Sequence, residues 1–159
     1  MTWRRRCATP SACEAAGEGF AAALRPGDIV LLSGPLGAGK TTFVKGVARG
    51  LGVRERVTSP TFVMVREHRC ANEWGISILH HADVYRVSDL GEVVDLALGE
   101  LVEESAVALV EWGELASSVF GCDVLNVSFA LEPDDARTLE VSGALAVQRS
   151  AQLAQWERS

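Results

Sequence analysis

Short apolar runs alternate with stretches of helical periodicity along this chain, and this alternation is typical of α/β proteins. Apolar residues recur at helical spacing over 11–24, where Ser11 and Glu14 fit a capping box at the start of a helix. Residues 28–33 contain four consecutive apolar positions between turn residues, as in a buried parallel strand. A glycine-rich turn and a second helical pattern, which ends near Leu51, follow this strand. We therefore expect a strand–turn–helix unit at the centre of the fold.

The rest of the pattern predicts further strands and helices around this unit. Strands are expected at 62–67, 76–81, 106–110, 124–131 and 137–141, and helices at 89–102 and from about 144 onward. The polar stretch 69–75 would join the first two of these strands as a hairpin, and the turn 132–135 would join the last two. Together these elements predict a three-layer α/β sandwich, in which helices flank a central, mostly parallel (mixed) sheet.

Length and composition indicate one globular domain. The chain has 159 residues, of which 48% are hydrophobic, and this length is close to that of one typical domain. No stretch approaches the roughly 20 apolar residues of a membrane-spanning helix, so no membrane partner is expected. We expect a single domain over 1–159, with a core over about 27–132, an N-terminal strand and helix over 1–26, and a C-terminal hairpin and helix over 133–159.

The charge balance and the cysteines narrow the class of protein. Acidic residues outnumber basic ones by 21 to 15, which gives a net charge of −6. Because proteins that hold nucleic acid by themselves usually have a basic face, we expect neither DNA binding nor independent RNA binding. The four cysteines show no C-x-x-C spacing and are too sparse for a disulfide framework. They predict a protein with reduced thiols in the cytoplasm.

The sharpest chemical signal is the segment Gly34–Thr41, whose sequence GPLGAGKT satisfies the phosphate-loop pattern G-x-x-x-x-G-K-[ST]. Residue frequencies give roughly 0.002 chance matches in a chain of this length, and an apolar strand and a helical pattern flank the segment as required. The chain has only two lysines, and Lys40 stands where the pattern needs an ammonium group. Nucleotide binding is therefore the first prediction.

Each residue type in this P-loop segment has a task. Glycines let backbone N–H groups approach phosphate oxygens, beside the positive N-terminal end of the following helix. Lys40 would reach the β- and γ-phosphates of ATP or ADP, the Thr41 hydroxyl would bind Mg²⁺, and Thr42 would add a phosphate contact. The candidate nucleotide-binding residues of the loop are Gly34, Leu36, Gly37, Ala38, Gly39, Lys40, Thr41 and Thr42.

A P-loop needs an acidic residue near the metal, and Glu111 is the best candidate. The apolar run 106–110 places Glu111 at the carboxyl end of a strand, where α/β sheets bind ligands. A glutamate with a purely structural salt bridge is the alternative. Trp112 is either a packing residue or a contact to the nucleotide or a partner. The GTPase patterns D-x-x-G and N-K-x-D are absent from the sequence, so nothing indicates selectivity for guanine.

Further segments accompany the P-loop in a characteristic order. SPTF at 59–62 follows the loop by about twenty residues, HADVYR at 81–86 lies about twenty residues beyond it, and VEW at 110–112 closes the set. With GPLGAGKTT, these motifs resemble the TsaE (YjeE) family, the ATPase subunit of the bacterial machinery that makes threonylcarbamoyladenosine on tRNA. The resemblance covers about 27–132, and it implies a P-loop NTPase fold.

The resemblance also implies residue roles and partners. Thr61 would sit on a switch-like loop that senses the γ-phosphate, and Asp83 and Glu111 would surround Mg²⁺ and the attacking water. Tyr85, Arg86 and Trp112 would complete the nucleotide pocket or the partner face. Both acids are able to orient a water, so the base stays unassigned between them. The implied partner is the TsaB–TsaD heterodimer, with tRNA reached only through that complex.

Three function classes follow from these motifs. The leading hypothesis is a weakly hydrolysing ATPase that is stimulated by its partners and supports threonylcarbamoylation of adenosine in tRNA. A small-molecule P-loop kinase is an alternative, and its lid arginines would have to come from Arg66, Arg69 or Arg86. A nucleotide-sensing adaptor without catalysis is the other.

Three smaller features have two interpretations each. His81 is either part of the site or a hydrogen-bonded strand histidine. The basic segment 3–6 is an edge strand or a contact near tRNA. In the C-terminal helix, Leu153 and Trp156 belong to the core or to a docking surface.

Overall fold

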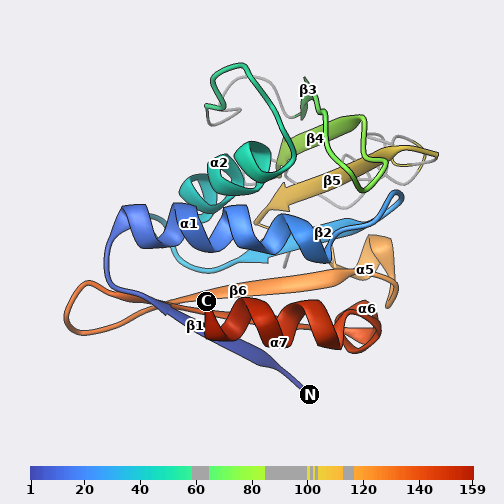
Figure 1. Ribbon diagram of the computed structural model, residues 1–159. Helices are drawn as coiled ribbons and strands as arrows, with labels where there is room; N and C mark the ends of the chain where they lie inside the picture. The colour runs from blue at the N-terminus through green and yellow to red at the C-terminus, as the bar shows by residue number, and fades with distance from the viewer. Residues whose placement is uncertain (59–64, 85–99, 101, 103, 113–116) are drawn as a thin grey trace.

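The computed structural model of this chain describes residues 1–58, 65–84, 100, 102, 104–112 and 117–159. Within these residues, a 7-stranded sheet has the order β1-β7-β6-β2-β5-β4-β3 (Figure 1). Its strands are β1 Trp3–Cys7, β2 Ile29–Ser33, β3 Val65–Arg69, β4 Ile78–Asp83, β5 Ala106–Glu111, β6 Leu125–Leu131 and β7 Arg137–Ser142. The described helices are α1 Pro10–Phe20, η1 Ala21–Ala23 (a 3₁₀ helix), α2 Lys40–Gly50, α5 Ser117–Phe120, α6 Ala144–Gln148 and α7 Ser150–Arg158.

The centre of the sheet is parallel. β2 lies between β5 and β6 and is parallel to both, and β4 is parallel to β5. Every residue of β5 is buried, because both faces of this central strand are covered. The register pairs Asp83 with Glu111 across β4 and β5, and pairs Leu32 with Glu111 across β2 and β5. The ends of these three strands therefore meet at one edge of the sheet.

Antiparallel strands extend the sheet on both sides, which confirms the predicted mixed sheet. β3 pairs with β4 and β7 pairs with β6, as the two predicted hairpins require. β1 pairs antiparallel with β7 and lies at one of the two edges of the sheet, so the basic segment is an edge strand. Arg4 forms an ion pair with Glu140 at 2.5 Å, and Arg6 forms one with Asp134. Acids thus neutralise two of its three arginines.

The first helix starts earlier than the capping box predicts. Thr9 is the N-cap of α1, its hydroxyl accepts a hydrogen bond from the Ala12 amide at 3.1 Å, and Pro10 occupies the first turn. The predicted capping box of Ser11 and Glu14 is therefore wrong. Proline is favourable in the first turn because its missing N–H has no partner there in any case.

Helices α1, α2 and α7 share one hydrophobic core on one face of the sheet. Phe20 of α1, Phe43 of α2 and Trp156 of α7 belong to this core, and Phe20 packs against both other rings. The Trp156 indole nitrogen donates to the Ala16 carbonyl at 2.7 Å. Leu153 and Trp156 are both buried, so the interpretation of this helix as core packing is confirmed.

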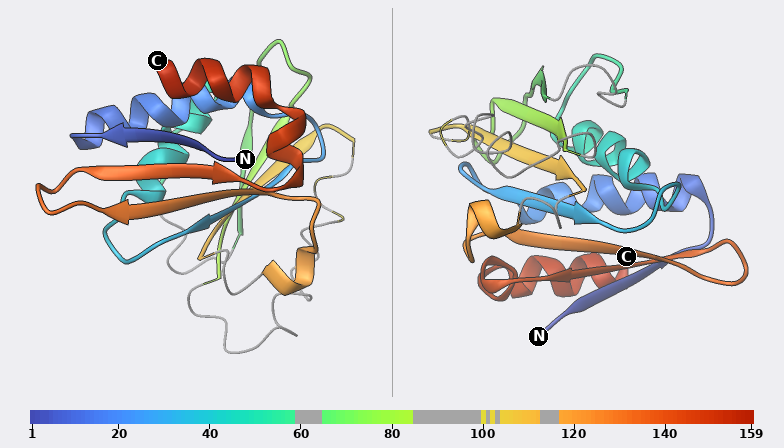
Figure 2. Two further views of the ribbon diagram at one scale, coloured as in Figure 1. Left: turned by 90° about the horizontal axis from the view of Figure 1, so that it is seen from below. Right: turned by 180° about the vertical axis from the view of Figure 1, so that it is seen from behind.

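A second, smaller core lies on the opposite face of the sheet. It includes Ile29, Leu31, Ala108 and Val110, and Phe120 of α5 packs against it. In the left view of Figure 2, α1 and α7 lie on one side of the sheet and α5 on the other. The predicted helix 89–102 falls almost entirely outside the described residues. None of the described helices has both the length and the apolar character needed to span a bilayer.

Candidate nucleotide-binding site

The glycine-rich loop joins the carboxyl end of β2 to the first residue of α2, Lys40. Gly34 has a φ of 142°, and a Cβ at this position would lie 2.6 Å from the carbonyl oxygen of Phe129. Gly39, the N-cap of α2, has a left-handed φ of 96°. Both positions need glycine, because side chains rarely adopt these angles and Gly34 has no room for one. The loop thus turns tightly onto a helix N-terminus, whose free N–H groups and partial positive charge fit a phosphate group.

Lys40 is buried inside this loop, with 5% of its surface exposed. Its Nζ donates to the carbonyl oxygens of Gly34 at 2.7 Å and Pro35 at 2.9 Å. The same ammonium lies 4.0 Å from the centroid of a Trp112 ring, a cation–π contact. The Lys40 ammonium is therefore held beside the loop and the N-terminus of α2, where a phosphate group would bind.

The next residue, Thr41, begins a hydrogen-bonded chain that crosses to the sheet. The Thr41 hydroxyl donates to Glu111 Oε1 at 2.8 Å, and His81 Nε2 lies 2.5 Å from Glu111 Oε2. Glu111 is 4% exposed and His81 is fully buried. A hydroxyl that donates to a carboxylate turns its lone pairs away from that carboxylate, which suits a metal ligand. The interpretation of His81 as a hydrogen-bonded strand histidine is confirmed, and its partner is the candidate metal acid.

Asp83 is the last residue of β4, the strand that pairs with β5, and lies beside the hydrogen bonds of Glu111. It pairs in register with Glu111, and it is half-buried. Among the described residues, no cluster of three or more His, Cys, Asp or Glu side chains is able to hold a metal by itself. The Thr41 hydroxyl and the Glu111 carboxylate, 2.8 Å apart, are oxygen donors of the kind that bind Mg²⁺, which is usually held through one or two protein oxygens together with substrate phosphates. Thr41 and Glu111 are the residues that would hold it.

Trp112 follows Glu111 directly and has an unusual backbone. Its φ is 62°, in the left-handed region that non-glycine residues seldom adopt. The side chain packs against the second core and also covers Lys40. Its position therefore combines the two predicted roles of packing residue and site residue, and a contact to the nucleotide itself stays a prediction.

Cys13 of α1 supports the loop from the core side. Its Sγ lies 3.5 Å from the Gly39 carbonyl oxygen. A hydrogen bond with Cys7, and then burial, raise the pKa of the Cys13 thiol, so the thiol keeps its proton. All four cysteines are free thiols.

Two residues near the site were missed or left undecided by the sequence. The H-x-D pattern at 81–83 marked His81, but only the fold brings it to Glu111. Arg137, at the start of β7, donates from Nη2 to the Gly37 carbonyl oxygen at 3.1 Å. Because 100 positions separate these two residues, no local pattern marks Arg137 as a site residue.

The other candidate residues do not meet at this loop. Arg66 and Arg69 lie on β3, which β4 and β5 separate from β2, so they do not form a lid over the loop. Thr61, the rest of the SPTF motif, and Tyr85 and Arg86 lie outside the described residues. Their roles stay predictions.

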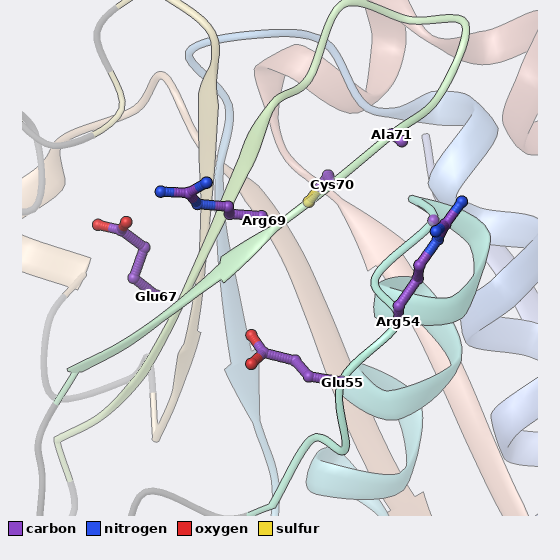
Figure 3. Close-up of a pocket in the computed structure, with 7 residues that line it drawn as sticks. Arg54, Glu55, Glu67, Arg69, Cys70 and Ala71 are labelled. Atoms are coloured by element: carbon purple, nitrogen blue, oxygen red, sulfur yellow. The ribbon is translucent and has the colours of Figure 1, made fainter.

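A cavity of about 450 Å³ lies elsewhere, along the outer edge of the sheet beside β3. Its lining residues are Gly52, Arg54, Glu55, Glu67, Arg69, Cys70 and Ala71. In Figure 3, Arg54 and Arg69 project in different directions from the α2–β3 connection and the strand. No candidate nucleotide-binding residue lines this cavity, so the P-loop remains the candidate site.

Comparisons with known proteins give a consistent family. The model of the family "Threonylcarbamoyl adenosine biosynthesis protein TsaE" matches residues 7–139. The chain is 40% identical over 139 residues to the tRNA threonylcarbamoyladenosine biosynthesis protein TsaE of Bacillus subtilis, covering 87% of this chain and 83% of that protein. It is 37% identical to the Treponema pallidum TsaE, covering 86% of this chain and 99% of that protein. The crystal structure of Bacillus subtilis YdiB superposes with a TM-score of 0.77 at 30% identity, covering 99% of this chain and 95% of the other.

Proposed function

This chain belongs to the TsaE family of tRNA threonylcarbamoyladenosine biosynthesis proteins, and from this premise we propose that it is a P-loop ATPase that serves this modification. Its cofactors are ATP, or the product ADP, and Mg²⁺. One observation carries the proposal: buried Lys40 and the Thr41–Glu111–His81 chain meet at the carboxyl edge of the parallel strands. That edge is where open α/β sheets bind their ligands.

The residues of this edge divide the work as follows. The loop N–H groups and Lys40 bind the β- and γ-phosphates. When the phosphates bind, the Lys40 ammonium exchanges its hydrogen bonds to the Gly34 and Pro35 carbonyls for stronger, charge-assisted hydrogen bonds to phosphate oxygens. Thr41 would offer an oxygen lone pair to the metal while its hydroxyl keeps its hydrogen bond to Glu111. Bound Mg²⁺ supplies charge neutralisation on the phosphates. His81 fixes the carboxylate of Glu111, and Asp83 stands beside it in register.

Two acids are therefore available to orient the attacking water. Glu111 has both carboxylate oxygens in hydrogen bonds, so it is held rigidly, whereas Asp83 is half-buried at the end of β4. Because the Glu111 carboxylate is held in place, it is able to position a water without having to move first. We therefore expect it to act by positioning the water rather than as a strong base. Hydrolysis by the isolated protein is expected to be slow.

The partners we propose are TsaB and TsaD, which would hold the tRNA. The net charge of −6 supports an indirect route to tRNA, because an acidic surface repels the phosphate backbone. The ion pairs that neutralise Arg4 and Arg6 remove much of the positive charge from the one basic segment. The protein then acts in the cytoplasm as an ATP-driven subunit of this assembly.

Reconstitution tests this function directly. With purified TsaB, TsaD, tRNA and the threonylcarbamoyl donor, we expect several rounds of modification per complex only when this chain and ATP are both present. ATP hydrolysis should rise at least about tenfold when the TsaB–TsaD heterodimer is added, as one charged group supplied in trans would provide. The readouts are modified nucleoside per complex and released phosphate.

Two results would contradict the proposal. Hydrolysis by the isolated chain at tens per second, unchanged by the heterodimer, would indicate a free-standing ATPase. Transfer of the γ-phosphate to a metabolite, with little release of inorganic phosphate, would indicate a small-molecule kinase.

A further inference from the structure

The β6–β7 hairpin brings a second cation to the P-loop from the side opposite Glu111. β6 is parallel to β2, so its carboxyl end and the turn to β7 lie at the same edge as the loop (Figure 1). β5 and Glu111 flank β2 on one side, and β6 and β7 flank it on the other. At the start of β7, Arg137 reaches the Gly37 carbonyl oxygen at 3.1 Å and also contacts the Asp135 carbonyl oxygen.

The charge of Arg137 is not neutralised by a carboxylate in the part of the chain that the structure describes. Its hydrogen-bond acceptors there are both backbone oxygens. Arg4, Arg6, Arg49 and Arg149 of the described residues pair with acids. Within the same residues, the guanidinium groups of Arg5 and Arg25 resemble Arg137 in donating only to hydroxyl or carbonyl oxygens, so Arg137 differs from them by its contact with the P-loop. A half-buried guanidinium that has no carboxylate partner among the described residues and contacts a P-loop is well placed for a ligand contact.

An exposed apolar residue directly precedes the loop residue that Arg137 contacts. Leu36 precedes Gly37 in the loop and is 79% exposed, although it is one of the few large apolar residues at the surface of the described residues. A planar guanidinium is able to stack on the face of a flat aromatic ring, and an aliphatic side chain is able to cover such a ring by apolar contact. Phosphate oxygens bind a guanidinium but gain nothing from an aliphatic side chain.

The position of the metal residues gives the direction of the ligand. Thr41 and Glu111 lie on the β5 side, so terminal phosphates held there leave the nucleoside end of the ligand to extend toward β6. We propose that Arg137 and Leu36 form the subsite for the base of the nucleotide, and that the β6–β7 hairpin makes the site selective for a nucleotide over bare polyphosphate. This proposal rests on nucleotide binding at the P-loop.

Calorimetric titration of the full chain with two probes, ADP and tripolyphosphate, each with Mg²⁺, tests the subsite. We expect Arg137→Ala to weaken ADP binding about tenfold, as the loss of a stacked cation would, and to change tripolyphosphate binding by less than about twofold. Arg137→Lys keeps the charge but not the plane, so it should restore only part of the ADP affinity. Arg158→Ala, an exposed arginine in the last turn of α7, is the matched control and should change neither affinity.

Each other outcome has a definite meaning. Equal losses for ADP and tripolyphosphate in Arg137→Ala would overturn the base subsite, because Arg137 would then contact phosphate. Unchanged affinity for both probes, or full recovery of ADP binding by Arg137→Lys, would overturn it as well. A wild-type chain that binds neither probe would overturn nucleotide binding itself, and the melting temperature of each variant shows whether a loss reflects unfolding.

Discussion

Substitution of Lys40 by alanine is expected to weaken ATP binding by about 100-fold, the loss that follows when a charged, buried phosphate contact is removed. The ammonium lies inside the loop, where the carbonyls of Gly34 and Pro35 and a Trp112 ring hold it at the helix N-terminus. Alanine removes both the positive charge and the long side chain that carries it to the phosphates. Isothermal titration with ATP and Mg²⁺ measures the effect.

The other lysine of the chain provides the matched control. Lys45 lies in the same helix, α2, and is exposed. Lys45→Ala removes the same charge from the same element, so it should change ATP affinity by less than about twofold, since an exposed charge at this distance is screened by salt. Similar losses in the two variants would mean that net charge, and not the position of Lys40, governs binding.

Substitution of Gly17 by alanine is expected to destabilise the fold by about 3 kcal/mol or more, at the upper end of ordinary substitutions. A Cβ at Gly17 of α1 would lie 2.1 Å from the carbonyl oxygen of Phe43, in the backbone of α2. On the other helix, a Cβ at Gly46 would lie 1.9 Å from the Glu14 carbonyl oxygen. The two helices cross with backbone against backbone, so neither is able to yield without moving the other.

A second glycine of α1 separates this clash from helix propensity. A Cβ at Gly19 would make an ordinary contact of 3.5 Å with the Trp156 side chain. Gly19→Ala should therefore stabilise the protein by about 0.5 to 1 kcal/mol, as alanine does in helix interiors. Urea denaturation followed by circular dichroism gives both free energies of unfolding. A Gly17→Ala variant as stable as Gly19→Ala would show that α1 and α2 do not approach as closely as described.

The same helix packing connects stability to the site. α2 begins at Lys40, and Cys13 of α1 contacts the Gly39 carbonyl oxygen. Any change that separates α1 from α2 is therefore expected to displace the start of α2 and with it the P-loop. For this reason ATP affinity in Gly17→Ala should fall even where the variant remains folded.

Elements with strong local signals were predictable from the sequence. β2 and β5 are apolar up to their last residues, Ser33 and Glu111, because both faces are covered. The helical pattern after the P-loop was expected to end near Leu51, and α2 ends at Gly50. The start of α1 was predicted wrongly because two capping signals compete over Thr9–Glu14. The Thr9-Pro10 pair, which combines a capping hydroxyl with proline in the first turn, prevails over the Ser11–Glu14 box.

Contacts between distant segments were not predictable in this way. The strand order brings His81 to Glu111 and Arg137 to Gly37, and no periodicity or spacing in the chain encodes that order. The predictions for Thr61 and for the helix 89–102 concern residues that the structure does not describe, and they stay predictions. The sequence thus marked the loop and Glu111 as candidates, while the fold supplied the neighbours that hold them.

The most direct test of the proposed ATPase centre is the rate of ATP hydrolysis by Glu111→Gln in the presence of TsaB and TsaD. Glutamine keeps the size of the side chain but loses the charge that Thr41 and His81 now share. We predict that ATP affinity stays within about threefold of the wild type while the hydrolysis rate falls at least about 100-fold, the usual share of a water-orienting or proton-accepting group. Hydrolysis at the wild-type rate by a variant that binds ATP normally would contradict the assignment of this edge of the sheet as the catalytic centre.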